Sequence, residues 1–189
     1  MKKILVICGA SGSGKSHLED GLAFFYPDTF KPLKQYTTRA RRPDDELESY
    51  VFLTKQEVEL LHQESNTKII GETEISGNLY GTFLENFPDH ISTIVLNRMG
   101  IDNIINHPHL QDYRVRILRV KAGEDIELVT REGRPVEYIQ QEEESLEPVA
   151  DLTLVRHLEG FDYEEILLQI HDLFDQERGY YDFQSLGKD

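Results

Sequence analysis

The sequence of 189 residues is poor in cysteine and has no long apolar run. Its one cysteine, Cys8, cannot form an internal disulfide, so nothing in the chain indicates an oxidising compartment. No apolar stretch approaches the roughly 20 residues that a membrane-spanning helix requires. The apolar run after Lys2 and Lys3 is too short for a signal peptide and is soon broken by glycines. We therefore expect a cytoplasmic protein of one domain, large enough to bury a core without disulfides or metals.

Basic residues are also scarce, with 20 Lys and Arg against 35 Asp and Glu and a formal net charge of −15. Nucleic acids are bound by broad basic surfaces, so this balance argues against a nucleic-acid polymer as a partner. It does not exclude a small anion held in a local pocket of arginines. We expect neither a nucleic acid nor a membrane among the partners, and the sequence leaves the oligomeric state open.

A glycine-rich segment follows the first apolar run. After residues 4–7 and Cys8 the chain reads Gly-Ala-Ser-Gly-Ser-Gly-Lys-Ser, and a helical pattern begins at His17. A phosphate-binding loop requires this order of strand, loop and helix, because its glycines let backbone N–H groups curl around a triphosphate at the helix N-terminus. A strand-to-helix turn that binds no ligand is the alternative. The pattern favours a nucleoside triphosphate bound by Gly9, Ala10, Ser11, Gly12, Ser13, Gly14, Lys15 and Ser16. Lys15 would reach the β- and γ-phosphates, and the Ser16 hydroxyl would bind Mg²⁺.

Strand and helix patterns alternate along the rest of the chain. Apolar runs predict buried strands at residues 4–7, 92–96, 113–120 and 152–155. Helical patterns stand at residues 17–25 and 163–174, among others. Such alternation predicts an α/β fold, an open parallel sheet with helices on both faces. The ligand is then expected at the carboxyl ends of the strands.

Three arginines, Arg39, Arg41 and Arg42, lie within four residues of an otherwise acidic chain. The planar guanidinium group suits bidentate binding of phosphate. The alternative is a solvated basic turn that pairs with the acidic residues between positions 44 and 48. From these residues alone, the two interpretations are about equally supported.

Several segments, taken together, resemble guanylate kinase in order and spacing. They are the loop at 9–16, Tyr-Pro-Asp-Thr-Phe at 26–30, Tyr-Thr-Thr-Arg at 36–39 with Arg42, Tyr-Val-Phe at 50–52 and Ser-Gly-Asn-Leu-Tyr-Gly-Thr at 76–82. The resemblance is close over the first half of the chain and weaker beyond it. It implies a P-loop NTPase fold of three layers in one domain, with a core at about 1–33, 88–122 and 145–176. An α+β insertion at about 34–87 would bind the acceptor, and residues 123–144 would form a lid.

The resemblance also implies roles for individual residues. Arg39, Arg42, Tyr50 and Tyr80 match the positions that hold the acceptor monophosphate, and Thr82 matches a hydroxyl that touches the base. Gln35 stands where the family has a serine at the acceptor phosphate. Catalysis would use Lys15 and Arg42 with the lid arginines Arg131 and Arg134. Arg156 falls at the adenine-side position of ATP, and Ser16 would hold the Mg²⁺ that accompanies it.

The chain departs from the family at the base. Gly71 stands where the family has the glutamate that reads guanine. Glu72 is displaced by one residue, which in a strand turns it to the opposite face. Glu74 is expected on the correct face but displaced along the strand. Asn97 would offer the base an amide where the family has a carboxylate.

Further departures concern the metal and the lid. Val95 takes the place of an aspartate that steadies Mg²⁺ through water, which a valine side chain cannot do. The lid is shortened after Arg134 and Pro135, and its later arginine falls about where Glu142 stands.

The sequence thus predicts a phosphotransferase that uses ATP with Mg²⁺ and acts on a small phosphorylated acceptor. A nucleoside monophosphate, GMP or dGMP first, is the favoured acceptor. Loss of a group that hydrogen-bonds the base can change selectivity by orders of magnitude. A sugar-phosphate kinase similar to ribose 1,5-bisphosphate phosphokinase is therefore one alternative. A non-catalytic binding module similar to the guanylate-kinase-like domains of scaffold proteins is the other.

Overall fold

The structure, a computed structural model, describes residues 1–43, 45, 50–64, 68–105, 107–126 and 136–176. Within these residues a five-stranded sheet forms the core, in the order β2-β7-β1-β8-β9. Each pair of neighbouring strands is parallel. Its strands are β1 (Lys2–Cys8), β2 (Phe30–Pro32), β7 (Ile91–Val95), β8 (Tyr113–Ala122) and β9 (Leu152–Arg156). The predicted parallel sheet is confirmed, and its carboxyl edge is where a ligand is expected.

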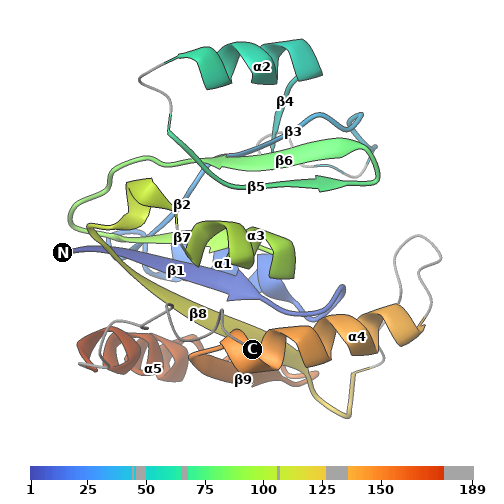
Figure 1. The fold of residues 1–189 in the computed structure, drawn as a ribbon. Helices are drawn as coiled ribbons and strands as arrows, with labels where there is room; N and C mark the ends of the chain where they lie inside the picture. The colour runs from blue at the N-terminus through green and yellow to red at the C-terminus, as the bar shows by residue number, and fades with distance from the viewer. Residues whose placement is uncertain (44, 46–49, 65–67, 106, 127–135, 177–189) are drawn as a thin grey trace, which may run out of the picture.

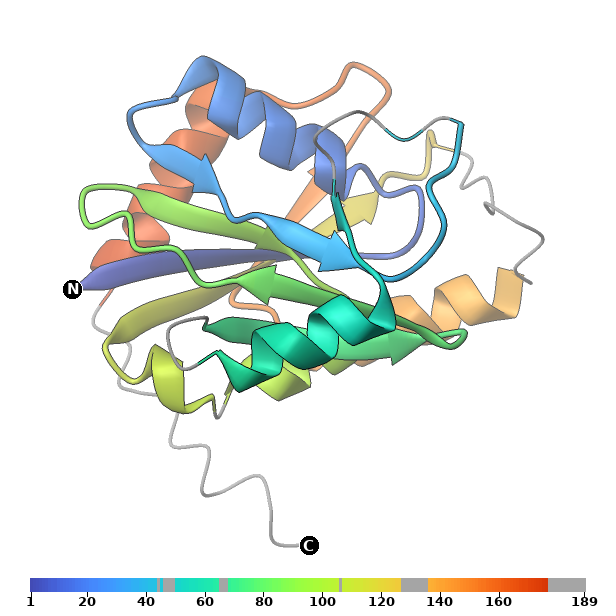
Figure 2. The same ribbon diagram turned by 90° about the horizontal axis from the view of Figure 1, so that it is seen from above.

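Helices cover both faces of this sheet (Figures 1 and 2). The helices α1 (Lys15–Phe25) and α5 (Tyr163–Asp175) lie on one face, and α3 (Arg98–Ile105) and α4 (Val136–Leu146) lie on the other. The side chains of β1 alternate between two buried clusters. Leu5 and Ile7 pack with α1 and α5, and Ile4 and Val6 pack with α3. Because both faces are covered, β1 reads as one continuous apolar run.

A second, smaller sheet lies beside the core in the order β4-β3-β6-β5. Its strands are β3 (Gln35–Thr37), β4 (Val51–Phe52), β5 (Ile69–Ile75) and β6 (Asn78–Phe83). The helix α2 (Lys55–Gln63) covers the face away from the core (Figure 1). Thr54 and Glu57 form the capping box that begins α2. The short helices η1 (Pro108–Leu110) and η3 (Glu147–Val149) complete the described elements.

The β5–β6 hairpin differs in one respect from a regular ladder. The register shifts between Ile70 and Thr73, so β5 carries a bulge at Gly71 and Glu72. Ser76 and Gly77 both have positive φ at the turn, which closes the hairpin before β6. The bulge decides which β5 side chains face the core. No helix within the described residues has the length and apolar character needed to cross a membrane.

Candidate functional site

The glycine-rich loop connects the carboxyl end of β1 to the first turn of α1. Gly9, Gly12 and Gly14 have φ of 149°, 83° and 103°. A Cβ at Gly9 would lie 2.2 Å from the Val120 carbonyl oxygen. A Cβ at Gly14 would lie 2.6 Å from Arg156 Nη1. These close approaches explain why glycine stands at both positions.

Two carboxylates of α4 meet the loop. The Ala10 backbone N–H donates to Glu143 Oε1 at 3.2 Å, and the Ser11 N–H donates to Glu142 Oε2 at 3.2 Å. These oxygens occupy the position of an anionic ligand on the loop amides. The sequence predicts Glu142 and Glu143 only as part of the lid at about 123–144, and not as residues that contact the loop. The loop thus presents backbone donors to anions, as a phosphate-binding loop must.

Lys15 and Arg119 supply positive charge around the loop. Lys15 Nζ donates to the carbonyl oxygens of Gly9 at 2.8 Å and Ala10 at 2.7 Å. Arg119 on β8 is buried, and its Nη1 lies 3.9 Å from Glu143 Oε2. Arg119 was also missed, because the sequence pattern of β8 predicts only a buried strand.

Arg156 lies over the loop from the end of β9. Its guanidinium group is adjacent to Gly14, at the N-terminus of α1. Beside it, residues 121–125 form a cleft with Val155 and His157. Asp125 anchors this segment by accepting the Leu158 N–H at 2.9 Å. The structure therefore brings Arg156 to the triphosphate loop, on the side that the family resemblance assigns to adenine.

The arginine cluster surrounds a carboxylate and stacks on aromatic rings. Arg39 Nη1 and Nη2 donate to Asp45 Oδ2 at 2.6 Å and Oδ1 at 2.7 Å. The Arg39 guanidinium carbon lies 5.4 Å from the centroids of both Tyr50 and Phe52. The Tyr50 and Tyr80 rings are 6.3 Å apart between centroids. Arg39, Tyr50 and Tyr80 are thus brought together, as the resemblance implies.

Hydrogen bonds and burial in this cluster shift the pKa values of Asp45, Arg39 and Tyr50. Hydrogen bonds from the Arg39 guanidinium and from the Arg42 backbone N–H hold the pKa of Asp45 far below its usual range. The hydrogen bond to Asp45 raises the pKa of Arg39 in return. Burial raises the pKa of the Tyr50 phenol. Tyr50 is therefore a neutral hydroxyl that can donate to a phosphate oxygen.

The register of the small sheet places four polar residues on one face. Gln35 pairs with Thr82, and Thr37 pairs with Tyr80. Gln35 Nε2 donates to Thr82 Oγ1 at 3.3 Å and to the Val95 carbonyl oxygen at 3.1 Å. Val95 ends β7, the neighbour of β1 in the core sheet. This face of the small sheet therefore meets the carboxyl edge of the core sheet.

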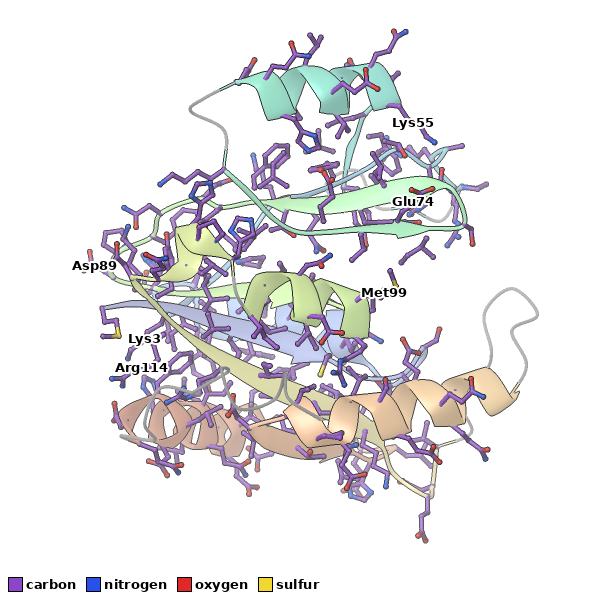
Figure 3. The ribbon with its side chains drawn as sticks, viewed as in Figure 1. Lys3, Lys55, Glu74, Asp89, Met99 and Arg114 are labelled. Atoms are coloured by element: carbon purple, nitrogen blue, oxygen red, sulfur yellow. The ribbon has the colours of Figure 1, made fainter. Side chains whose placement is uncertain are left out.

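The structure does not bring Glu74 to this face. Thr73 pairs with Tyr80, whereas Glu74 pairs with Leu79 and is exposed. Figure 3 labels Glu74 beside the turn that joins β5 to β6. The expectation that Glu74 lies on the base-reading face does not hold in this geometry. The reason is the bulge, which inserts a residue and changes the alternation beyond it.

Gly71 and Glu72, at the bulge, serve the packing of the small sheet. Gly71 has φ of 61°, and a Cβ there would meet Leu96 Cδ2 at 3.2 Å and Ile104 Cγ2 at 3.3 Å. Glu72 accepts hydrogen bonds from the Tyr36 hydroxyl and, at 2.8 Å, from His62 of α2. Glu72 thus points away from the acceptor side, as expected from the sequence. Neither Glu72 nor Glu74, the carboxylates of β5, lies on the face that carries Tyr80 and Thr82.

Asn97 begins α3. Its Oδ1 accepts the Gly100 backbone N–H at 2.9 Å, which satisfies one of the donors at the helix start. This capping bond uses the amide oxygen that could otherwise meet a base. The remaining predicted residues are Arg42, whose side chain is exposed, and Arg131 and Arg134, which lie outside the described residues. Their catalytic roles stay predictions.

Comparisons with known proteins relate this chain to a family and to a fold. The family model described as guanylate kinase matches residues 1–97, just over half of the chain. The crystal structure of guanylate kinase from Anaplasma phagocytophilum is similar in fold, with 17% sequence identity and a TM-score of 0.57 over 92% of this chain and 84% of that one. A sugar kinase from Janibacter sp. is 18% identical over 93% of this chain and 95% of that one, with a TM-score of 0.41.

Proposed function

Because the chain belongs to the guanylate kinase family, we propose that it transfers the γ-phosphoryl group of ATP to the phosphate of a nucleoside monophosphate. GMP and dGMP are the first acceptors to test. The proposed partners are ATP with Mg²⁺ and a small phosphorylated acceptor, and the proposed location is the cytoplasm.

The main support for this proposal is the hydrogen bond from Gln35 to the Val95 carbonyl oxygen at the end of β7. It joins the face with Tyr80 and Thr82 to the core edge where β1 enters the phosphate loop. Two anion sites, the loop amides and the cage of Arg39, Tyr50 and Tyr80, thereby open onto the same edge. Phosphoryl transfer requires a donor and an acceptor phosphate held in line, and this arrangement supports such an alignment.

The chemistry needs no covalent enzyme intermediate, because phosphoryl transfer depends on positioning and charge stabilisation. The loop N–H groups and Lys15 would hold the β- and γ-phosphates. Arg39 would bind two acceptor phosphate oxygens through its planar fork, and the neutral Tyr50 hydroxyl would donate to a third. To do so, Arg39 must release Asp45, and the loop amides must release Glu142 and Glu143.

The residues around the loop also fit Mg²⁺ bound with ATP. The Ser16 hydroxyl lies in the first turn of α1, and buried oxygens of Glu19 and Thr93 have no hydrogen-bond partner within the described residues. Within those residues no group of three or more carboxylate, histidine or cysteine side chains could hold a metal alone. A protein site that leaves most positions to phosphate and water suits Mg²⁺. The bound ion would neutralise charge on the phosphates.

The geometry of β5 favours a second candidate, a sugar-phosphate acceptor. A guanine-reading carboxylate at position 71 would need a side chain where Gly71 has positive φ and packs against Leu96 and Ile104. With Glu74 on the other face, base selection would rest on Thr82 and Asn97. An acceptor without a base, such as ribose 1,5-bisphosphate, would not need Thr82 and Asn97 for recognition.

A coupled assay of ADP release tests the proposal with a panel of GMP, dGMP, other nucleoside monophosphates and ribose 1,5-bisphosphate. We expect ADP release that depends on one of these acceptors and is lost in Lys15→Met. The exposed Lys55 of α2 gives a matched control, Lys55→Met, which should retain activity. Turnover with only ribose 1,5-bisphosphate would select the second candidate. No acceptor-dependent turnover would favour a non-catalytic binding module.

A further inference from the structure

Four buried side-chain oxygens within the described residues have no hydrogen-bond partner. They are Ser13 Oγ, Glu19 Oε1, Thr93 Oγ1 and Glu143 Oε2. Buried polar atoms are normally hydrogen-bonded, so such atoms mark places where water or an ion is expected. Of the four, Glu143 Oε2 still has Arg119 Nη1 at 3.9 Å. All four belong to the phosphate loop or to the elements that pack around it. Beyond their place near the loop, Glu19 and Thr93 have no role of their own in the proposed phosphoryl transfer.

Glu19 and Thr93 face each other between α1 and β7. The Thr93 hydroxyl lies beside the Glu19 carboxylate, outside the geometry of a regular hydrogen bond, and its effect is to lower the pKa of Glu19. Burial has the larger and opposite effect and, with a smaller contribution from Asp20, raises the pKa of Glu19 to about 7. Neither neighbour is a cation. A cation at the carboxylate would offset the cost of burying its charge.

Glu19 and Thr93 lie near position 95, where the family resemblance implies an aspartate and this chain has Val95. Residues three apart share one face of a helix, so Glu19 follows Ser16 along the same side of α1. Residues two apart share one face of a strand, so Thr93 and Val95 point to the same side of β7. Val95 packs against the cluster formed with α1. The Glu19 carboxylate therefore lies beside the strand face from which an aspartate at position 95 would project.

Glu19 is also near the acceptor half of the site. Its charge raises the pKa of Tyr50, in the cage around Arg39. The Glu19 carboxylate is therefore near both Thr93 of β7 and Tyr50 of the acceptor cage. The γ-phosphate and its metal ion are expected in this part of a phosphoryl-transfer site.

We propose that Glu19, supported by the Thr93 hydroxyl, supplies the carboxylate on the metal side of the donor site that Val95 cannot provide. With Ser16, it would bind Mg²⁺ or the water molecules around it. This inference rests on the proposed function, since both place ATP with Mg²⁺ on the loop. Glu19 of α1 would thus take the metal-binding role that the family resemblance assigns to an aspartate at position 95 of β7.

Calorimetric titration of ATP with and without Mg²⁺ tests this inference without relying on activity. In the unaltered protein, Mg²⁺ should tighten ATP binding. In Glu19→Gln, we expect this effect of Mg²⁺ to fall by roughly tenfold or more, as on loss of a group that orients a metal ligand. Binding of ATP without Mg²⁺ should stay equal or improve, because one negative charge near the triphosphate is removed. The neighbouring Asp20→Asn loses the same charge and should keep the effect of Mg²⁺.

A rescue variant separates a metal role from a packing role. Adding Val95→Asp to Glu19→Gln returns a carboxylate to the same side of β7 and should restore the Mg²⁺ effect. Near-ultraviolet circular dichroism checks that each variant is folded. An unchanged Mg²⁺ effect in folded Glu19→Gln, or loss without rescue, would overturn the inference while leaving the proposed function intact. Absence of ATP binding by the unaltered protein would instead overturn the proposed function, and this inference with it.

Discussion

The guanidinium group of Arg39 holds the carboxylate of Asp45 in a bidentate pair, with N···O distances of 2.6 and 2.7 Å. Both side chains are only 10% exposed, and the Arg42 backbone N–H donates to the same carboxylate at 2.7 Å. The guanidinium group that is proposed to bind the acceptor phosphate is thus paired with a carboxylate of the same chain. In the proposed mechanism, the acceptor phosphate would have to displace Asp45 before it could bind Arg39.

Removing the charge of Asp45 should therefore strengthen acceptor binding. We expect Asp45→Asn to lower the acceptor KM by about three- to tenfold, since a charge-assisted pair becomes a weaker neutral contact. Steady-state kinetics at saturating ATP measures this change. Asp102→Asn, which breaks the exposed pair between Asp102 and Arg98 on α3, is the control and should leave KM unchanged. A higher KM in Asp45→Asn would show that Asp45 supports the cage rather than competes with the acceptor.

Replacement of Arg39 by lysine should impair use of the acceptor. The ammonium group lacks the planar fork and stacks less well on Tyr50 and Phe52, so it cannot reproduce bidentate binding. We expect Arg39→Lys to reduce kcat/KM for the acceptor by about 10- to 100-fold, while the ATP dissociation constant stays within about twofold. Kinetics with calorimetry of ATP binding measures both quantities. Arg98→Lys is the matched control. Equal losses in ATP and acceptor binding would place Arg39 outside a dedicated acceptor site.

Gly71 should be required for stability. Alanine there would combine the strain of positive φ with contacts at 3.2 and 3.3 Å to Leu96 and Ile104. We expect Gly71→Ala to lower the free energy of unfolding by about 1–3 kcal/mol. Gly77→Ala also has positive φ but meets nothing within 4 Å, so it isolates the backbone strain. Urea denaturation of both variants compares them. A smaller loss in Gly71→Ala than in Gly77→Ala would contradict the tight packing at the bulge.

Cys8 should be chemically inert in the folded protein. Burial raises the pKa of its thiol from 9.0 to about 12, although Lys15 and Arg119 act in the opposite direction. Only about one thiol in ten thousand is then ionised at pH 8, and the thiolate is the reactive form. We expect a disulfide reagent at pH 8 to label the native protein at least about a hundredfold more slowly than the urea-unfolded chain. Comparable rates would contradict a buried thiol.

The same pKa shift makes stability depend on pH. Because the thiol of Cys8 binds its proton more tightly in the folded state, the unfolded chain loses the proton first as pH rises. This contribution to stability is fully present below pH 9 and is lost between about pH 9 and 12.

The sequence could predict those parts of the site that depend on the succession of neighbouring elements along the chain. The loop from Gly9 to Ser16 follows a buried strand and precedes a helix, so its place at the carboxyl edge follows from β-strand and helix patterns alone. The acceptor cage could be predicted only through its resemblance to guanylate kinase, because Arg39 follows β3 whereas Tyr80 lies on β6. Their approach depends on the antiparallel register of β3 and β6.

The remaining features depend on contacts that no local pattern encodes. The bulge at Gly71 changes the alternation of β5, and for that reason Glu74 does not reach the face expected for it. Glu142 and Glu143 belong to an acidic run of the sequence, yet their oxygens accept from loop amides more than a hundred residues away in the chain. Nothing in the local sequence around Glu19 indicates that β7 packs against it.

Transfer of radioactive label from ATP tests the central claim most directly. The protein is incubated with Mg²⁺, ATP labelled in the γ-phosphate and each acceptor in turn, and the products are separated. The structure predicts that the label moves to the phosphate of one acceptor, that little reaches inorganic phosphate, and that Lys15→Met abolishes the transfer. Label that stays on ATP, or passes only to inorganic phosphate with every acceptor, would contradict a two-phosphate transfer site.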